Sequence, residues 1–118
     1  MGVYTHLRIV ERPRYESGGS AHPNTILFAE NFFLTRVDGD QFDMAFYGTA
    51  HEVAHTWWGG EVSGAAGVRG QGLSESLANY SAMMVTETVL GPEKARKVYD
   101  FQMNRYLTQR AEYRCIIR

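Results

Sequence analysis

The segment His51-Glu52-Val53-Ala54-His55 constrains the fold of this chain more than any other feature of the sequence. Residues four apart on an α-helix point the same way, so the two imidazoles converge if this segment is helical. They can then hold one Zn²⁺, and Glu52, at the edge of the same face, can take a proton from a water beside the metal. The alternative interpretation is a pair of core histidines that bond the backbone.

The first third of the chain carries the pattern of short strands. Alternating polarity predicts a strand over residues 4–11, and an apolar, aromatic run predicts a second over residues 24–36. Residues 16–23 are rich in Gly and Ser and are expected to form a loop. Asp38-Gly39-Asp40 is typical of a turn, and we expect no calcium loop from these acidic residues.

The remainder of the chain carries the pattern of helices. We expect one helix from an N-cap at Asp43 to residue 58, then an irregular Gly- and Ala-rich connection over residues 61–72. A second helix over residues 73–90 is apolar on most sides, which predicts burial, and a third begins at Pro92. Strands followed by helices predict one α+β domain over residues 1–118. The residues expected to face the core are Phe46, Ala50, Val53 and Trp57 in the first helix and Ala95, Val98, Tyr99, Met103, Tyr106 and Leu107 in the third.

A catalytic zinc held by two histidines needs a third protein ligand and one open position. Glu75, at the start of the second predicted helix, can supply it if that helix packs back onto the first. Asn79 lies one turn later and could bond the outer nitrogen of a ligand histidine, which would fix the tautomer of that ring. A buried amide that bonds the backbone is the alternative role for Asn79. Trp57 and Trp58 are expected to form an apolar wall behind the metal.

Two stretches of the sequence, at residues 50–59 and 73–80, resemble the aminopeptidase N family of zinc metallopeptidases in the gluzincin group. The 19 residues between His55 and Glu75 resemble a bacterial branch that is fused to membrane segments of the ABC-transporter type. The resemblance covers about residues 7–110. It implies a fragment of a zincin-like catalytic domain, one Zn²⁺ per chain, a peptide substrate, and a parent protein associated with a membrane.

The same family carries a G-x-M-E-N strand before the zinc helix, whose glutamate binds the free amine of the substrate. Glu30 and Asn31 match the last two positions of that motif, whereas Leu27 and Ala29 replace its Gly and Met. The resemblance therefore implies that Glu30 and Asn31 bind substrate and restrict hydrolysis to the first peptide bond. A solvent-exposed glutamate at the end of a strand is the alternative.

Family members also use a downstream tyrosine to stabilise the oxyanion. The resemblance implies that it lies farther downstream of the ligand glutamate than residue 118. Core packing explains Tyr99 and Tyr106 better than a catalytic role does. Two alternatives to an aminopeptidase therefore stay open. One is a zinc endopeptidase, and the other is a non-catalytic zinc-binding fragment.

Composition sets the remaining limits. A net charge of −1 gives no indication of a nucleic-acid partner, and no apolar run is long enough for a membrane segment. Cys115 is the only cysteine and is expected to be a free thiol. His6 and His22 lack ligand spacing to the motif, so we expect surface roles for both. The sequence determines neither the compartment nor the oligomeric state.

Overall fold

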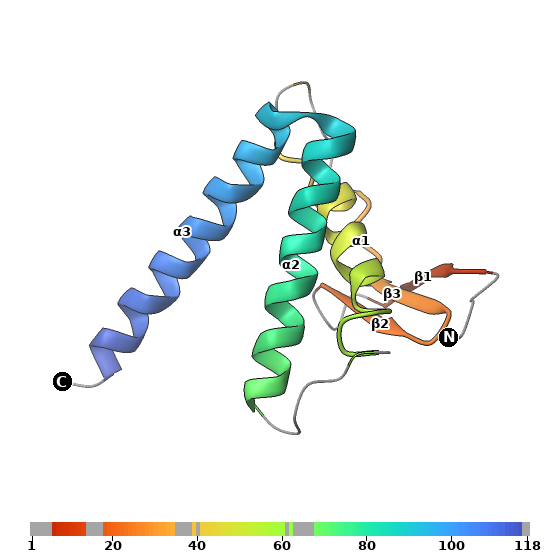
Figure 1. Cartoon of the computed structure of the whole chain (residues 1–118), viewed down its shortest axis with the longest axis horizontal. Coiled ribbons are helices and arrows are strands. Elements are labelled where there is room, and N and C mark those ends of the chain that lie inside the picture. Colours follow the sequence, from red (N-terminus) through yellow and green to blue (C-terminus); the bar gives the residue numbers. More distant parts are fainter. Residues whose placement is uncertain are drawn as a thin grey trace.

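The computed structural model describes residues 6–13, 18–34, 39, 41–60, 62 and 68–116. In these residues the strands precede the helices, which confirms the α+β class (Figure 1). The elements are β1 (Arg8–Arg12), β2 (Gly19–His22), β3 (Thr25–Ala29), α1 (Met44–Ala54), α2 (Val68–Leu90) and α3 (Pro92–Ile116).

The sheet has β3 at its centre, parallel to β1 and antiparallel to β2. Ile26 and Phe28 on β3 are fully buried, as expected for a central strand. The predicted loop at residues 16–23 is wrong over residues 19–22, which form β2 and join β3 through a two-residue turn; residues 16 and 17 lie outside the described residues. Asn24 in that turn has a φ of 59°, a conformation that Asn tolerates and that tight hairpin turns require.

The predicted strand over residues 24–36 is too long, because β3 ends at Ala29. Phe32 and Phe33 leave the strand and pack instead around Phe28, with ring centroids 4.3 and 5.0 Å from the Phe28 ring. The aromatic run therefore forms a cluster at the end of the sheet and does not extend β3.

Helix α1 begins as predicted, with the Asp43 carboxylate accepting a hydrogen bond of 2.8 Å from the backbone N–H of Phe46. It ends at Ala54 and not at residue 58, because residues 55–57 form a turn. The helical spacing therefore does not extend to Trp57, whose predicted core position is wrong: 53% of this residue is exposed.

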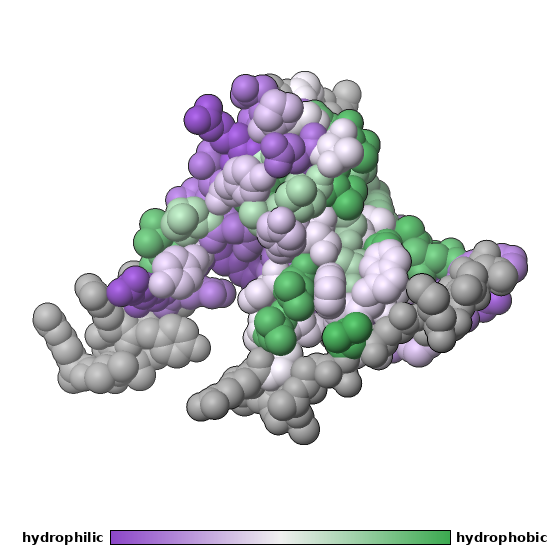
Figure 2. Space-filling model, in the orientation of Figure 1, coloured by the Kyte–Doolittle hydropathy of each residue, from purple (hydrophilic) through white to green (hydrophobic). Residues whose placement is uncertain are grey.

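Helix α2 begins at Val68, so the predicted irregular connection up to residue 72 is wrong over its last five residues. Its predicted burial is also wrong. Small residues such as Ala78 and Ala82 form the contact face, while large apolar residues lie at the surface. Figure 2 shows hydrophobic side chains at the surface along α2 and α3. On α2 the exposed large residues include Leu73, Tyr80, Met84, Val85 and Val89.

Helix α3 follows a turn at Gly91, and Pro92 begins it as predicted. Ala95 and Val98 are buried near this turn, but the helix then diverges from α2 (Figure 1). The predicted inward positions farther along are therefore wrong, since these side chains are exposed: Tyr99, Met103, Tyr106 and Leu107.

The core where the three helices meet consists of Tyr47, Ala82 and Val98, with four half-buried residues packed against it: Phe42, Met44, Ala50 and Met83. Over the part of the chain that the structure describes, none of the helices has an apolar stretch sufficient to cross a bilayer.

Candidate metal centre

His51, His55 and Glu75 converge from two neighbouring helices. The Nε2 atoms of the two histidines lie 3.1 Å apart. Glu75 Oε2 lies 3.3 Å from His51 Nε2, and Glu75 Oε1 lies 3.3 Å from His55 Nε2. One ligand atom from each of the three residues falls within 4.8 Å of the others. The predicted set of ligands is therefore brought together, and it could hold a metal ion.

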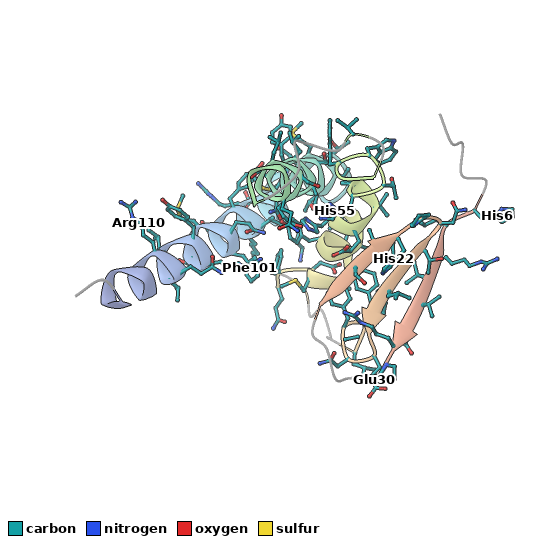
Figure 3. All side chains as sticks on the ribbon, turned by 90° about the horizontal axis from the view of Figure 1, so that it is seen from below. His6, His22, Glu30, His55, Phe101 and Arg110 are labelled. Atoms are coloured by element: carbon teal, nitrogen blue, oxygen red, sulfur yellow. The ribbon has the colours of Figure 1, made fainter. Side chains whose placement is uncertain are left out.

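His55 lies one residue beyond the end of α1 but keeps helical dihedral angles, so it stays in line with His51. Its Nδ1 lies 2.9 Å from the backbone carbonyl of Trp58. Because a carbonyl oxygen only accepts, the proton of His55 belongs on Nδ1, which leaves the lone pair of Nε2 directed at the cluster. Figure 3 shows His55 between α1 and α2.

Ser74 ties the start of α2 to the same carbonyl. Its hydroxyl donates to the Trp58 oxygen at 2.5 Å and lies 3.4 Å from His55 Nδ1. Gly59 makes this approach possible: its φ is 105°, and a Cβ there would lie 2.6 Å from Ser74 Oγ. The turn after α1 is therefore interlocked with the helix that carries Glu75.

The roles of Ser74 and Gly59 were not predicted from the sequence. The available signal was weak: a hydroxyl residue immediately before the carboxylate ligand. A second bond between these elements runs from Trp58 Nε1 to Ser81 Oγ at 2.9 Å, so Trp58 holds α2 through a polar contact.

Glu52 is buried on the side of α1 that faces the sheet. A Cβ at Gly19 on β2 would lie only 2.9 Å from Glu52 Cγ and Oε1, so the absence of a side chain at Gly19 accommodates this carboxylate. Burial raises the pKa of Glu52, the neighbouring His55 opposes the shift, and the negative charge of Glu75 adds to it. Glu52 is therefore a carboxylate of raised proton affinity, and two of the three clustered residues, His55 and Glu75, contribute to its pKa.

The surroundings of His51 favour the neutral form of its ring. Burial lowers its pKa, the neighbouring His55 lowers it further, and Glu75 opposes the shift. A neutral imidazole is the form that binds metals. Within the described part of the chain, the buried Nδ1 of His51 has no hydrogen-bond partner.

Asn79 does not make the predicted bond to a ligand histidine. Its Oδ1 accepts instead from the Tyr47 hydroxyl at 2.5 Å and from Gln102 Nε2 at 3.3 Å, and Gln102 Nε2 also donates to the Tyr47 oxygen at 2.6 Å. The physical reason is that α1 presents Tyr47 at this level, one turn before His51. The predicted role of Asn79 is therefore corrected: it joins α1, α2 and α3.

Glu30 and Asn31 are not brought to the cluster. Glu30 follows the last residue of β3, and its backbone N–H donates to the Arg12 carbonyl at 3.0 Å. Asn31 accepts from the N–H of Leu34 at 3.3 Å and belongs to a turn. Figure 3 shows Glu30 at the end of the sheet away from His55.

The remaining residues considered from the sequence lie outside the metal cluster or outside the described residues. His6 and His22 are exposed, as predicted, and lie outside the cluster (Figure 3). Tyr99 donates to Glu87 Oε2 at 3.1 Å on the surface, not in the core. The predictions for Asp38, Asp40 and the side chain of Cys115 lie outside the described residues.

Comparisons with family models, with curated proteins and with solved structures each find no match to this chain. The resemblance described above thus depends on the motifs alone, and its implications stay predictions.

Proposed function

We propose that this chain is a zinc-dependent peptidase domain in which His51, His55 and Glu75 hold the ion. The supporting observation is the spacing of the donor atoms. Two ligands at about 2.0–2.1 Å from zinc in a tetrahedral site lie about 3.3–3.4 Å apart. The two histidine Nε2 atoms are 3.1 Å apart, and each lies 3.3 Å from a different oxygen of Glu75, which is close to this spacing. Two imidazoles and one carboxylate also leave the fourth position open, as catalytic zinc sites require.

Zinc held there would lower the pKa of a bound water to about 7 and polarise the carbonyl of the scissile bond. The chain supplies the proton transfers. A carboxylate oxygen of Glu52 accepts the proton of the attacking water and returns it to the leaving amine. Its raised pKa suits a base that must also act as an acid.

Other contacts hold the metal ligands in place. The Trp58 carbonyl, which also accepts from the Ser74 hydroxyl, orients the ring of His55. Burial lowers the pKa of His51 and so favours its unprotonated ring. These contacts come from both α1 and α2, so any change in how the two helices pack would alter the ligand geometry.

Removal of N-terminal residues is the specificity that the motif resemblance favours. Glu30 lies at the end of the sheet away from His55 (Figure 3), which favours the endopeptidase alternative. Hydrolysis of peptides with free and with acetylated N-termini distinguishes an aminopeptidase from an endopeptidase. An aminopeptidase cleaves only the free peptide, whereas an endopeptidase cleaves both.

The test is hydrolysis of internally quenched fluorescent peptides by zinc-loaded protein, before and after chelation and in Glu52→Gln. We expect activity that needs zinc and is lost in Glu52→Gln, although that variant still binds zinc. Activity that survives either change would refute the assigned chemistry. Stoichiometric zinc without hydrolysis of any peptide would instead identify a non-catalytic zinc-binding domain.

A further inference from the structure

Helices α1 and α3 run in the same direction, away from the turn that joins α2 to α3 (Figure 1). Lys94, near the start of α3, donates to the carbonyls of Gly39 and Gln41, which lie just before α1. The rings of Phe42 and Phe101 stack with centroids 4.9 Å apart. The two helices therefore begin at the same end of the molecule.

One contact joins α3 to α1 near the metal centre. Gln102 on α3 donates to the Tyr47 hydroxyl on α1 at 2.6 Å. The next turn after Tyr47 carries His51, and the next turn after Gln102 carries Arg105, since residues three or four apart share a helix face. Arg105 and His51 therefore both lie one turn beyond the Gln102–Tyr47 contact, on the same side of it.

Electrostatics agree with this placement. Burial is the main cause of both shifts: it raises the pKa of Tyr47 and lowers the pKa of His51. The positive charge of Arg105 is among the smaller causes, and it acts to lower the pKa of each group, as expected if the guanidinium lies on the side of α3 that faces α1.

Arg105 is exposed, and it makes no hydrogen bond or ion pair with any residue of the described ranges. Glu75 on α2 is held against the two histidines. By contrast, Arg110 on the same helix donates to the Tyr106 hydroxyl at 3.3 Å. A guanidinium that no described residue pairs offers a planar fork of donors, which matches a carboxylate.

We propose that Arg105 binds a carboxylate of the substrate peptide and thereby selects peptides that carry one near the scissile bond. The carboxylate can be the free C-terminus or an acidic side chain, since both present the same pair of oxygens. This inference rests on the proposed function, because it takes a peptide at the metal centre as its starting point.

The test measures peptide binding by calorimetry to zinc-loaded protein in a Glu52→Gln background, which prevents turnover. One pair of peptides differs only in a C-terminal carboxylate or carboxamide, and a second pair, amidated at the C-terminus, differs only in an internal Asp or Asn. We expect Arg105→Gln to weaken binding of the carboxylate member of one pair by about tenfold, as for a charge-assisted hydrogen bond, and to leave its neutral member unchanged. The pair that responds identifies the source of the carboxylate.

Two further variants sharpen this test. Arg105→Lys keeps the charge but loses the fork, so it should show a smaller loss than Arg105→Gln. Arg110→Gln removes the same charge from another face of α3 and should leave both pairs unchanged. Circular dichroism of each variant checks that α3 is intact.

A carboxylate that bound the zinc directly would not depend on Arg105, so equal affinities in the parent and Arg105→Gln would overturn the proposal. An equal loss for the carboxylate and neutral peptides would overturn it too. If the carboxylate preference depends on Arg105 but no peptide is hydrolysed by the Glu52-containing protein, the carboxylate site stands and the proposed catalysis fails. If peptides are hydrolysed but the carboxylate preference does not depend on Arg105, the proposed catalysis stands and the carboxylate site fails.

Discussion

The interlock between Gly59 and Ser74 leads to a prediction that separates metal-site geometry from general stability. Gly59 has a φ of 105°, in the region that favours glycine, and a Cβ there would lie 2.6 Å from Ser74 Oγ. Gly59→Ala must therefore both strain the backbone and displace the hydroxyl that bonds the Trp58 carbonyl. The substitution changes no metal ligand.

The two effects have different magnitudes. A left-handed conformation costs a non-glycine residue roughly 1–2 kcal/mol, and loss of a neutral hydrogen bond costs about 1 kcal/mol. Unfolding of Gly59→Ala should therefore need roughly 2–3 kcal/mol less free energy than unfolding of the parent. Because His55 Nδ1 and Ser74 share the Trp58 carbonyl, the ring and the start of α2 should both shift. Loss of such outer partners weakens metal binding by roughly 10- to 100-fold.

Gly91→Ala is the matched control. Gly91 also has a positive φ, 88°, but a Cβ there meets nothing within 4 Å, and the turn lies at the opposite end of α2 from Glu75. We expect it to lose only the backbone contribution and to bind zinc normally. The measurements are urea denaturation of metal-free protein and zinc competition with a chromophoric chelator. Unchanged zinc affinity in Gly59→Ala, or an equal loss in Gly91→Ala, would refute the reasoning.

Two further predictions concern stability. Burial raises the pKa of Glu52 above its ordinary 4.5, so the charged carboxylate is destabilising in the metal-free fold. The free energy of unfolding of Glu52→Gln should therefore match that of the parent below pH 4.5 and exceed it as the pH rises through the raised pKa. Urea denaturation at a series of pH values measures this difference. A difference that becomes smaller as the pH rises would contradict the prediction. Tyr47→Phe removes the hydroxyl that joins Asn79 and Gln102 and should cost roughly 1–3 kcal/mol, by the same measurement, with little change in zinc affinity. A large loss of zinc affinity would show that this network orients the metal ligands.

The metal ligands could be predicted because their geometry is local. His51 and His55 are one turn apart, so their convergence needs only helical dihedral angles, which persist one residue beyond the end of α1. Glu75 depended on one further step, the return of α2 against α1. A connection rich in Gly and Ala allows that return, and the 3.3 Å separations agree with it.

Other features depended on tertiary contacts that no local pattern encodes. β2 forms from a Gly-rich segment because β3 offers it a partner and Glu52 occupies the space beside Gly19. Asn79 bonds Tyr47 because α1 happens to present a hydroxyl at that level. The apolar residues of α2 and α3 were expected to be buried from periodicity, but the helices diverge and leave residues such as Leu73 and Met103 exposed.

The most direct test of the metal centre is a zinc titration of the purified chain beside Glu75→Ala, with Glu87→Ala as a control on the exposed surface of α2. We expect one zinc per chain. We also expect the zinc affinity of Glu75→Ala to fall by more than the roughly 10- to 100-fold expected for an outer partner, while Glu87→Ala binds zinc like the parent. A chain that binds no zinc, or a Glu75→Ala variant that binds it as tightly as the parent, would contradict this expectation.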